Sequence, residues 1–281
     1  ELFGHHLFSV SAAEAAAMDP QQRQLLERGY TALRIAGMTK SSMLGMVIAV
    51  NVGQWHSEFE SVLRTSPAAL SVYASTGFSC AVTCGRVSFT LGLQGPCASF
   101  DTACSSSLVG SHSSIRALQR HECPAALSSG VNMLLDAGTM RGNAIAGFTS
   151  ITGRSHTFDN RADGYARSEA IDTVVCRRAE SAPVRLLGSA IRQDGRSASL
   201  TAPNGQAQQG VLSASLADSQ LAFDELSALE MHGTGTALGD PIEASAIAAV
   251  FLSRWDRTKP RLAVGSLKAN AGHTEPGAGL A

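Results

Sequence analysis

The stretch Phe100–Leu108 reads FDTACSSSL and marks the point where a strand gives way to a helix. Before it, turn residues at Gly92 and at Gly95-Pro96 divide residues 87–101 into two expected strands. After it, a helix is expected from Cys104 to about His121, because apolar residues recur at helical spacing: Leu108, Val109, Ile115 and Leu118. A strand that leads into a helix is the repeating unit of a layered α/β fold.

The same alternation runs along the rest of the chain. Asp19 as N-cap with Pro20 at the first helical position predicts a helix that ends at Gly37. Residues 138–170 are rich in Gly, Arg and Asp, which favours long loops with short helices. Further helices are expected to end near Leu63 and to span 77–88, 206–221 and 240–255, and further strands 44–52, 125–133, 171–176, 184–193, 228–231 and 261–266. This order predicts an α/β fold with a mainly buried sheet.

Composition excludes several classes of protein. The 281 residues carry 22 Lys and Arg against 23 Asp and Glu, so the chain lacks the basic field that a nucleic-acid partner needs. No apolar run approaches the roughly 18 residues of a membrane helix. Charged residues make up only 16% and glycines number 27, which indicates a core of small residues and surface buried in an oligomer. The start at Glu1 and the apolar, Gly-rich end at 277–281 suggest a fragment cut at both ends.

The six cysteines are expected to be reduced thiols, because a chain of this length without a secretory signal has no need of disulfides. No C-x-x-C occurs, and neither Cys80 with Cys84 nor His5 with His6 has the second half of a zinc site, so no metal is expected.

Cys104 is the strongest candidate for a nucleophile. Small neighbours, Ala103 and Ser105, leave its sulfur accessible at the expected helix N-terminus. The positive end of the helix dipole should lower the pKa of such a thiol, and the unpaired N–H groups there can hold an oxyanion. The alternative, a small buried hydrophobic residue, remains open, and it is the favoured reading for the other five cysteines.

A second candidate segment is His232–Glu243, HGTGTALGDPIE. Its glycines follow G-x-G-x-x-x-G, which is not the dinucleotide fingerprint G-x-G-x-x-G. Asp240 is expected as the cap of the next helix, with Glu243 in its first turn, and two carboxylates there would repel a pyrophosphate. The glycines therefore favour a tight loop that directs His232 into a site.

The third segment, Gly265–Glu275, repeats this arrangement with His273. Either histidine alone could be a structural residue. Because Cys104, His232 and His273 lie far apart along the chain, only folding could bring them together.

Three motifs, DTACSSSL from Asp101, HGTGTALGDPIE from His232 and KANAGH from Lys268, closely resemble signatures of β-ketoacyl synthase (ketosynthase) domains in type I polyketide synthases and related fatty acid synthases. The resemblance extends over essentially the whole chain through MDPQQR (18–23), GLQGP (92–96), DGY (163–165) and TAPNG (201–205).

The resemblance implies a thiolase-like α/β fold of two similar halves in five layers, α-β-α-β-α, usually as a homodimer. Residues 1–180 would be the N-terminal half without its first strand, and residues 181–281 the start of a truncated C-terminal half. It also implies an acyl carrier protein, whose phosphopantetheine carries the substrates, and other synthase domains as partners. No bound cofactor is expected, and the expected compartment is the cytoplasm or an organelle such as a plastid.

The resemblance also implies residue roles. Cys104 would take the acyl chain as a thioester, and His232 and His273 would polarise a malonyl thioester that loses carbon dioxide and attacks the acyl group. The residues implied in support are Lys268 acting through Glu275, Asn270, and Thr234 and Thr236 as substrate-binding residues. The alternative is a ketosynthase-like domain that loads or gates acyl intermediates without extending them.

Two positions depart from the family pattern. Ser168 and Ala170 stand where the family usually has glycines. If either position required a positive φ, the loop would carry about 1 to 2 kcal/mol of strain.

Overall fold

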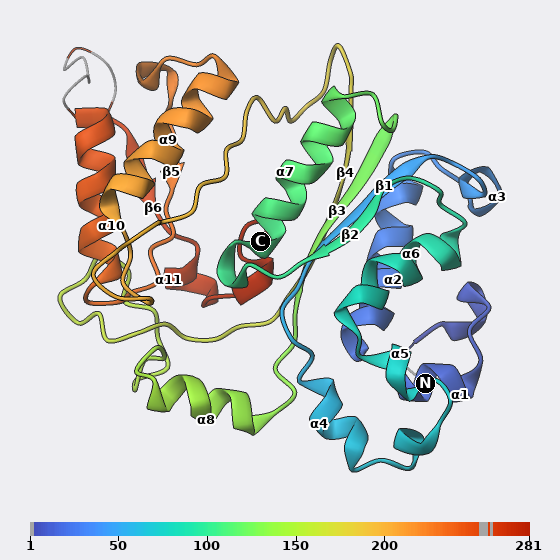
Figure 1. Ribbon diagram of the computed structural model, residues 1–281. Helices are drawn as coiled ribbons and strands as arrows, with labels where there is room; N and C mark the ends of the chain where they lie inside the picture. Colours follow the sequence, from blue (N-terminus) through green and yellow to red (C-terminus); the bar gives the residue numbers. More distant parts are fainter. Residues whose placement is uncertain (1–2, 253–257, 259–260) are drawn as a thin grey trace. The chain divides into compact units, whose positions relative to one another are not determined.

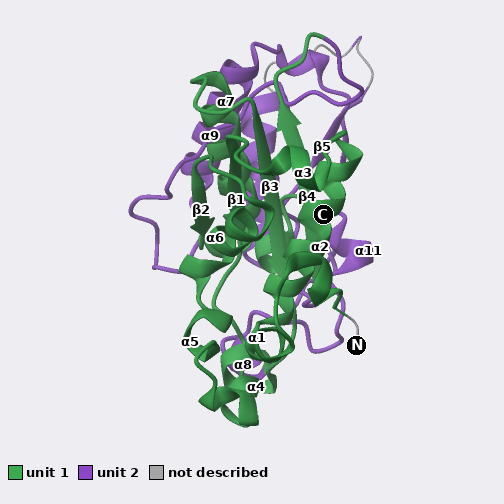
Figure 2. Ribbon diagram, turned by 90° about the vertical axis from the view of Figure 1, so that its right-hand side faces the viewer, with its two compact units in different colours: residues 1–140, 168–180, 274–281 green, residues 141–167, 181–273 purple. Residues whose placement is uncertain are grey.

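The computed structural model describes residues 3–252, 258 and 261–281. The chain divides into two compact units that interleave along the sequence (Figure 2). Unit 1 comprises residues 1–140, 168–180 and 274–281, and unit 2 comprises residues 141–167 and 181–273. A linear boundary between two halves near residue 180 stays a prediction.

Unit 1 is built on a four-stranded sheet in the order β2-β1-β3-β4 (Figure 1). The strands are β1 (Ile48–Gly53), β2 (Cys97–Phe100), β3 (Ala125–Asn132) and β4 (Ala170–Arg177). Strands β2 and β3 both pair in parallel with β1, and β4 is antiparallel to β3. The central strands β1 and β3 are buried along their whole length, as expected for parallel strands that are covered on both faces.

The two faces of this sheet carry different helices, α2 (Pro20–Ile35) and α6 (Cys80–Leu91) on one and α7 (Ser106–Gln119) on the other. Alternation along β1 separates them. Val50 and Val52 point into the large core with α2 and α6, whereas Ala49 between them packs against Ala117 of α7. Small residues on the α7 side allow that helix to approach the sheet closely.

Helix α2 confirms the local signals in its sequence. The Asp19 carboxylate accepts a hydrogen bond from the Gln21 amide at 2.7 Å, Pro20 is the first helical residue, and Gly37 follows the helix with a φ of +91°. The other helices of the unit are α1 (Ala12–Ala17), α3 (Lys40–Met43), α4 (Phe59–Arg64) and α5 (Ala74–Gly77), and α8 (Ala137–Ile145) begins here and continues into unit 2.

The prediction of two strands within residues 87–101 was wrong in its first part. Helix α6 continues to Leu91, and Gly92 ends it with a φ of +72°. Cys84, Val87 and Leu91 share one buried helical face, so burial outweighs the strand propensity of the local sequence. Only the second expected strand forms, as β2.

Unit 2 contains α9 (Gly205–Ser219), α10 (Gly239–Ile247), α11 (Lys268–Ala271) and the parallel strands β5 (Ala228–Glu230) and β6 (Ala263–Gly265). A π-helical turn, Ala248–Leu252, follows α10, and residues 253–255 of the predicted helix lie outside the described residues. The core of the unit gathers Met231, Ile247, Val250 and Phe251.

The strand predicted at 184–193 does not form: this segment is irregular, and Val184 and Leu186 are exposed. Its apolar pattern finds no pairing strand in the described part of the chain, and an unpaired backbone stays irregular. Among the described residues, no helix is both long and apolar enough to cross a membrane.

Candidate active site

Cys104 lies in unit 1, in the turn that joins β2 to α7. A short 3-10 turn, η3 (Ala103–Ser105), precedes α7, so the cysteine lies one residue before the helix cap and not at the first helical position. Serine hydroxyls hold this turn: Ser106 Oγ donates to the Ala103 carbonyl at 2.6 Å and accepts from the Thr102 amide at 2.9 Å. The serine that follows the turn therefore holds its backbone in place.

Two backbone features fix where this turn lies. Ala103 has a φ of +53°, a left-handed conformation that costs a non-glycine residue about 1 to 2 kcal/mol. On β1, a Cβ at Gly53 would lie 2.3 Å from the Ser107 amide nitrogen, so only glycine allows α7 to begin against the sheet. Backbone strain of this kind is typical of positions that are held for function, so it supports Cys104 as a candidate nucleophile.

His232 lies in unit 2 and follows β5, in a loop whose backbone amides donate hydrogen bonds to two carboxylates. Glu243 of α10 accepts hydrogen bonds from the amides of His232 and Gly233 at 2.6 and 2.8 Å. Asp240 accepts from the amides of Gly235 and Thr236 at 3.1 and 3.2 Å.

The prediction that Asp240 caps the helix was wrong. Helix α10 begins at Gly239, and the second oxygen of Asp240 accepts from the Phe158 amide at 2.8 Å, so this side chain fastens two loops. The four loop amides are already bonded to carboxylates, which leaves no amide cradle for a phosphate.

The backbone conformation of the loop requires its glycines. Gly233 and Gly235 have φ values of +46° and +80°. A Cβ at Gly235 would lie 2.7 Å from the His156 amide nitrogen. These contacts support the view that the glycines permit a tight turn that positions His232.

His273 ends unit 2 and is fully buried. It follows α11 and Gly272, whose φ is +77°, and its amide donates to the Ala166 carbonyl at 2.7 Å. The Tyr165 ring contacts the imidazole edge to face, with 4.9 Å between ring centroids.

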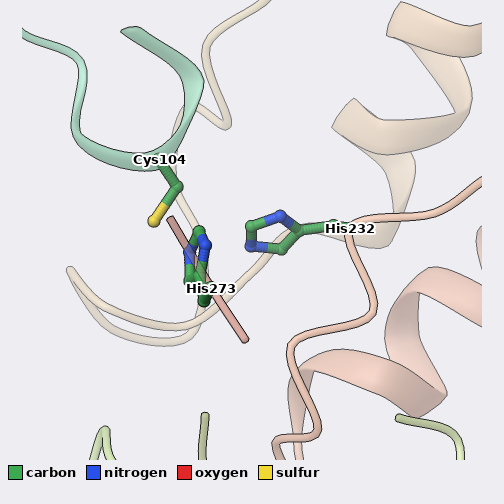
Figure 3. A group of neighbouring side chains, drawn as sticks. All are labelled: Cys104, His232 and His273. Atoms are coloured by element: carbon green, nitrogen blue, oxygen red, sulfur yellow. The ribbon is translucent and has the colours of Figure 1, made fainter. Parts of the chain in front are cut away.

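The two histidines of unit 2 form a pair (Figure 3). Their ring centroids are 5.5 Å apart and the rings are perpendicular at 87°. Burial, the neighbouring His232 and the Lys268 charge all lower the pKa of His273. Part of the His232 residue is exposed to solvent. The protein atoms around its imidazole nevertheless exclude water from the ring, and this desolvation, together with the Lys268 charge, lowers the pKa of His232 as well. Both rings are therefore neutral at physiological pH, and each carries one N–H donor and one acceptor nitrogen.

The segment after His273 returns to unit 1. It forms the short turn η6 (Glu275–Gly277), which packs against η3, the turn that contains Cys104. The Gly279 amide donates to Ser107 Oγ at 3.0 Å, and Asn132 Nδ2 donates to the buried Glu275 carboxylate at 3.0 Å. Glu275 itself has a φ of +48°. These contacts tie the residues that follow His273 to the residues that follow Cys104.

Comparison with known proteins identifies the family to which this chain belongs. The model for the β-ketoacyl synthase N-terminal domain matches residues 1–182, and the C-terminal domain model matches residues 184–281. The chain belongs to the β-ketoacyl synthase family.

Curated relatives of this ketosynthase domain are polyketide synthases. It is 42% identical over 99% of its length to one of the subunits of the phenolphthiocerol/phthiocerol polyketide synthase of Mycobacterium tuberculosis, and 41% identical over 99% to the pikromycin polyketide synthase component PikAII of Streptomyces venezuelae. It spans 18% and 8% of the length of these two relatives.

A solved structure agrees. The ketosynthase from module 6 of the bacillaene synthase of Bacillus subtilis 168 matches with a TM-score of 0.90 and 34% identity over 99% of this chain and 49% of that one. The resemblance to type I polyketide synthase ketosynthases and the thiolase-like α/β fold are thus confirmed.

The supporting residues named from the sequence lie in several places in the ketosynthase. Lys268 is buried at the start of α11, and its charge acts on both histidines, whereas Asn270 of the same helix is exposed. Thr234 and Thr236 lie in the His232 loop with their hydroxyl oxygens 3.3 Å apart. The sequence did not identify the loop-holding role of Asp240 and Glu243, because those bonds depend on where the loop folds back.

Ser168 and Ala170 carry no backbone strain, because neither has a positive φ. The Ser168 carbonyl accepts from Asn132 Nδ2 at 2.8 Å, and Ala170 begins β4. The ketosynthase therefore accommodates both departures from the family's glycines without the cost that a left-handed conformation would bring.

Proposed function

We propose that this domain is a β-ketoacyl-[acyl carrier protein] synthase that extends an acyl chain by decarboxylative condensation with a malonyl thioester. Cys104, His232 and His273 are its catalytic residues. The observation that carries the proposal is the pair of neutral imidazoles beside Lys268, together with a cysteine held in a strained turn between a strand and a helix.

In the first step, the Cys104 sulfur attacks the carbonyl carbon of an acyl group carried by phosphopantetheine. The new carbon–sulfur bond replaces the old one, and the phosphopantetheine thiol leaves with the proton of Cys104. Thioester exchange of this kind suits a cysteine, because its sulfur is both a good nucleophile and a competent leaving group.

In the second step, the carboxylate of the malonyl thioester leaves as carbon dioxide, and its bonding electrons form an enolate. N–H donors of His232 and His273 stabilise the charge on the enolate oxygen. The enolate carbon then attacks the acyl carbon on Cys104, and Cys104 leaves as the thiolate. Neutral imidazoles suit this role, because each offers an N–H without a permanent positive charge.

The covalent chain supports one joint site for the three residues. His273 lies only two residues before Glu275, and consecutive Cα atoms are about 3.8 Å apart, so the two Cα atoms are at most about 7.6 Å apart. Glu275 belongs to η6, which packs on the turn that holds Cys104. A partnership of Lys268 with Glu275, catalytic support from Asn270, and substrate contacts at Thr234 and Thr236 belong to the same proposal.

An acyl carrier protein and further synthase domains are the proposed partners, supported by curated relatives more than five times as long as this chain. A homodimer and a location in the cytoplasm are part of the proposal, and the family resemblance supports them.

Acyl loading tests the proposal. The protein that carries this domain is incubated with an acyl carrier protein bearing a short acyl chain and is then digested. The mass of the peptide that contains Cys104 is measured by mass spectrometry. We expect an acyl adduct on Cys104, and none after Cys104→Ala, whereas Cys176→Ala should load normally because Cys176 lies on β4 outside the proposed site. Normal chain extension by the Cys104→Ala variant would contradict the assignment. Loading without extension in the wild type would favour the loading or gating alternative.

A further inference from the structure

Two hydroxyl side chains of unit 2 lie beside the loops that carry its two histidines. Ser155 and Thr157 belong to the segment 155–166, which contains no helix or strand. Ser155 is buried, with 3% of its surface exposed, and Thr157 is half-buried. Neither residue lies in one of the sequence motifs, so the motifs alone did not identify them.

Thr157 holds the loop of His232. Its hydroxyl donates a hydrogen bond of 2.6 Å to the carbonyl of Gly233, the residue that follows the histidine. Glu243 already holds the amides of His232 and Gly233, but a carboxylate only accepts hydrogen bonds and cannot hold a carbonyl. The threonine therefore supplies the bond that the carboxylate cannot make, and both backbone polar groups of Gly233 are fixed.

Ser155 acts on His273 through one residue, Ala166. Ser155 Oγ accepts a hydrogen bond from the Ala166 amide at 3.0 Å, and the Ala166 carbonyl accepts one from the His273 amide at 2.7 Å. Tyr165, the residue before Ala166, contacts the His273 imidazole edge to face. A hydroxyl that restrains Ala166 thus restrains both the backbone and the ring of this histidine.

The segment 155–166 joins the two histidine loops. Thr157 bonds the His232 loop near the start of the segment, and Ala166 bonds His273 at its end. Between them, the Gly164 amide donates to a carbonyl of the His232 loop at 2.9 Å. One stretch of twelve residues therefore holds both imidazoles, whose centroids are 5.5 Å apart (Figure 3).

We propose that Ser155 and Thr157 are positioning residues that set the spacing of the two imidazoles through the backbone. Thr157 acts on the loop of His232, and Ser155 acts on His273. The inference rests on the proposed function, in which N–H donors of both rings stabilise one enolate oxygen. Two donors can serve one oxygen only while their geometry is held within about 0.5 Å.

Loss of either hydroxyl should separate the two steps of the reaction. Acyl loading depends on the Cys104 sulfur, whereas the enolate step depends on both rings. A hydrogen bond of this kind contributes a factor of about 2 to 10 to an equilibrium. We therefore expect Thr157→Val and Ser155→Ala to slow carbon dioxide release from a malonyl carrier protein by up to about tenfold, with acyl loading on Cys104 unchanged within about twofold.

Chemical modification of the histidines tests the positioning without an activity readout. Diethyl pyrocarbonate transfers an ethoxycarbonyl group to a neutral imidazole nitrogen and releases ethanol and carbon dioxide, so its rate reports access to each ring. The full-length protein is treated in its folded state, and the histidine peptides are followed by mass spectrometry. Ser155→Ala should accelerate modification of His273, and Thr157→Val that of His232, each by about 2- to 10-fold. The rate at His56, an exposed histidine of unit 1, should stay the same.

Two further variants serve as rescue and control. Thr157→Ser keeps the hydroxyl and should restore the wild-type rate at His232. Thr31→Val is the matched control, because it removes a threonine hydroxyl that donates to a carbonyl, that of Glu27 at 2.7 Å, on the exposed face of α2 in unit 1. It should change the modification of neither His232 nor His273.

The proposal is overturned if neither variant changes the modification of its histidine by more than about twofold, or if Thr157→Ser behaves like Thr157→Val. It is also overturned if modification accelerates while carbon dioxide release stays at the wild-type rate. Wild-type protein that releases no carbon dioxide would instead contradict the proposed function, and the modification rates would still decide whether the hydroxyls position the rings. Each variant is read at its own histidine, so one that fails to fold leaves the other decisive.

Discussion

Replacing Asp240 tests how the His232 loop is held. Its carboxylate accepts three hydrogen bonds from backbone amides, those of Gly235, Thr236 and Phe158, at 3.1, 3.2 and 2.8 Å. Phe158 has a φ of +53°, so the bond to its amide also stabilises an unfavourable backbone conformation. Asp240→Ala removes all three acceptors and leaves the amides to find other partners.

The magnitude follows from the number of bonds. A hydrogen bond to a charged group contributes about 1.5 to 3 kcal/mol, but three bonds to one carboxylate are not additive, so we take about 3 kcal/mol for their joint loss. Since 1.4 kcal/mol is a factor of ten, local opening of the loop should become about 100-fold more frequent. Asp240→Asn can keep the bonds to Gly235 and Thr236 and lose the one to Phe158, so we expect about a tenfold change.

Native-state hydrogen exchange of the Phe158, Gly235 and Thr236 amides measures this opening in the intact protein. Exchange should accelerate in the order wild type, Asp240→Asn, Asp240→Ala. Glu180→Ala, at an exposed carboxylate, should change these rates by no more than about twofold. Unchanged exchange in Asp240→Ala, or equal effects of the Asn and Ala variants, would refute the reasoning.

Two further predictions concern stability. Because the pKa values of His232 and His273 are lowered on folding, the unfolded chain binds more protons below its ordinary histidine pKa of about 6.5, so stability should fall as the pH drops below that value. Urea unfolding at pH 5 and pH 7.5 checks this, and the double variant with Asn at both positions should flatten the dependence; an equal slope in wild type and variant would contradict it. Gly53→Ala, whose Cβ would lie 2.3 Å from Ser107 N, should cost about 3 kcal/mol, whereas Gly85→Ala, with open space around its Cβ, should be neutral or stabilising by up to about 1 kcal/mol. Urea unfolding of both variants checks this pair, and equal losses would show that the close approach at Gly53 does not matter.

Local signals in the sequence were enough for much of the fold. Asp19 and Pro20 predicted the start of α2 because capping depends on neighbouring residues only. Residues 87–91 misled because their side chains suit a strand, and the helix forms for a tertiary reason, the burial of one face of α6. The segment 184–193 was expected to be a strand because of its apolar pattern, but it is irregular. A strand also needs a neighbouring strand to pair with, and the local pattern does not supply one.

The same distinction between local and tertiary signals applies to the candidate site. Cys104, His232 and His273 could be named from their motifs, because each lies in a short, distinctive stretch next to a strand or helix. The residues that hold them could not. Asn132 and Glu275 are 143 residues apart in sequence, and Asp240 faces Phe158 across 82 residues. Hydrogen bonds over such separations depend on the finished fold and leave no periodic signal.

Carbon dioxide release from a malonyl carrier protein labelled in its free carboxyl group tests the condensation most directly. In a single turnover, wild-type protein already acylated on Cys104 should release labelled carbon dioxide and transfer the extended β-ketoacyl chain to the carrier protein. His273→Ala should keep the acyl group on Cys104 and release neither. Wild-type protein that keeps its acyl group without releasing carbon dioxide, or a His273→Ala variant that extends the chain at the wild-type rate, would contradict the proposed role of the site.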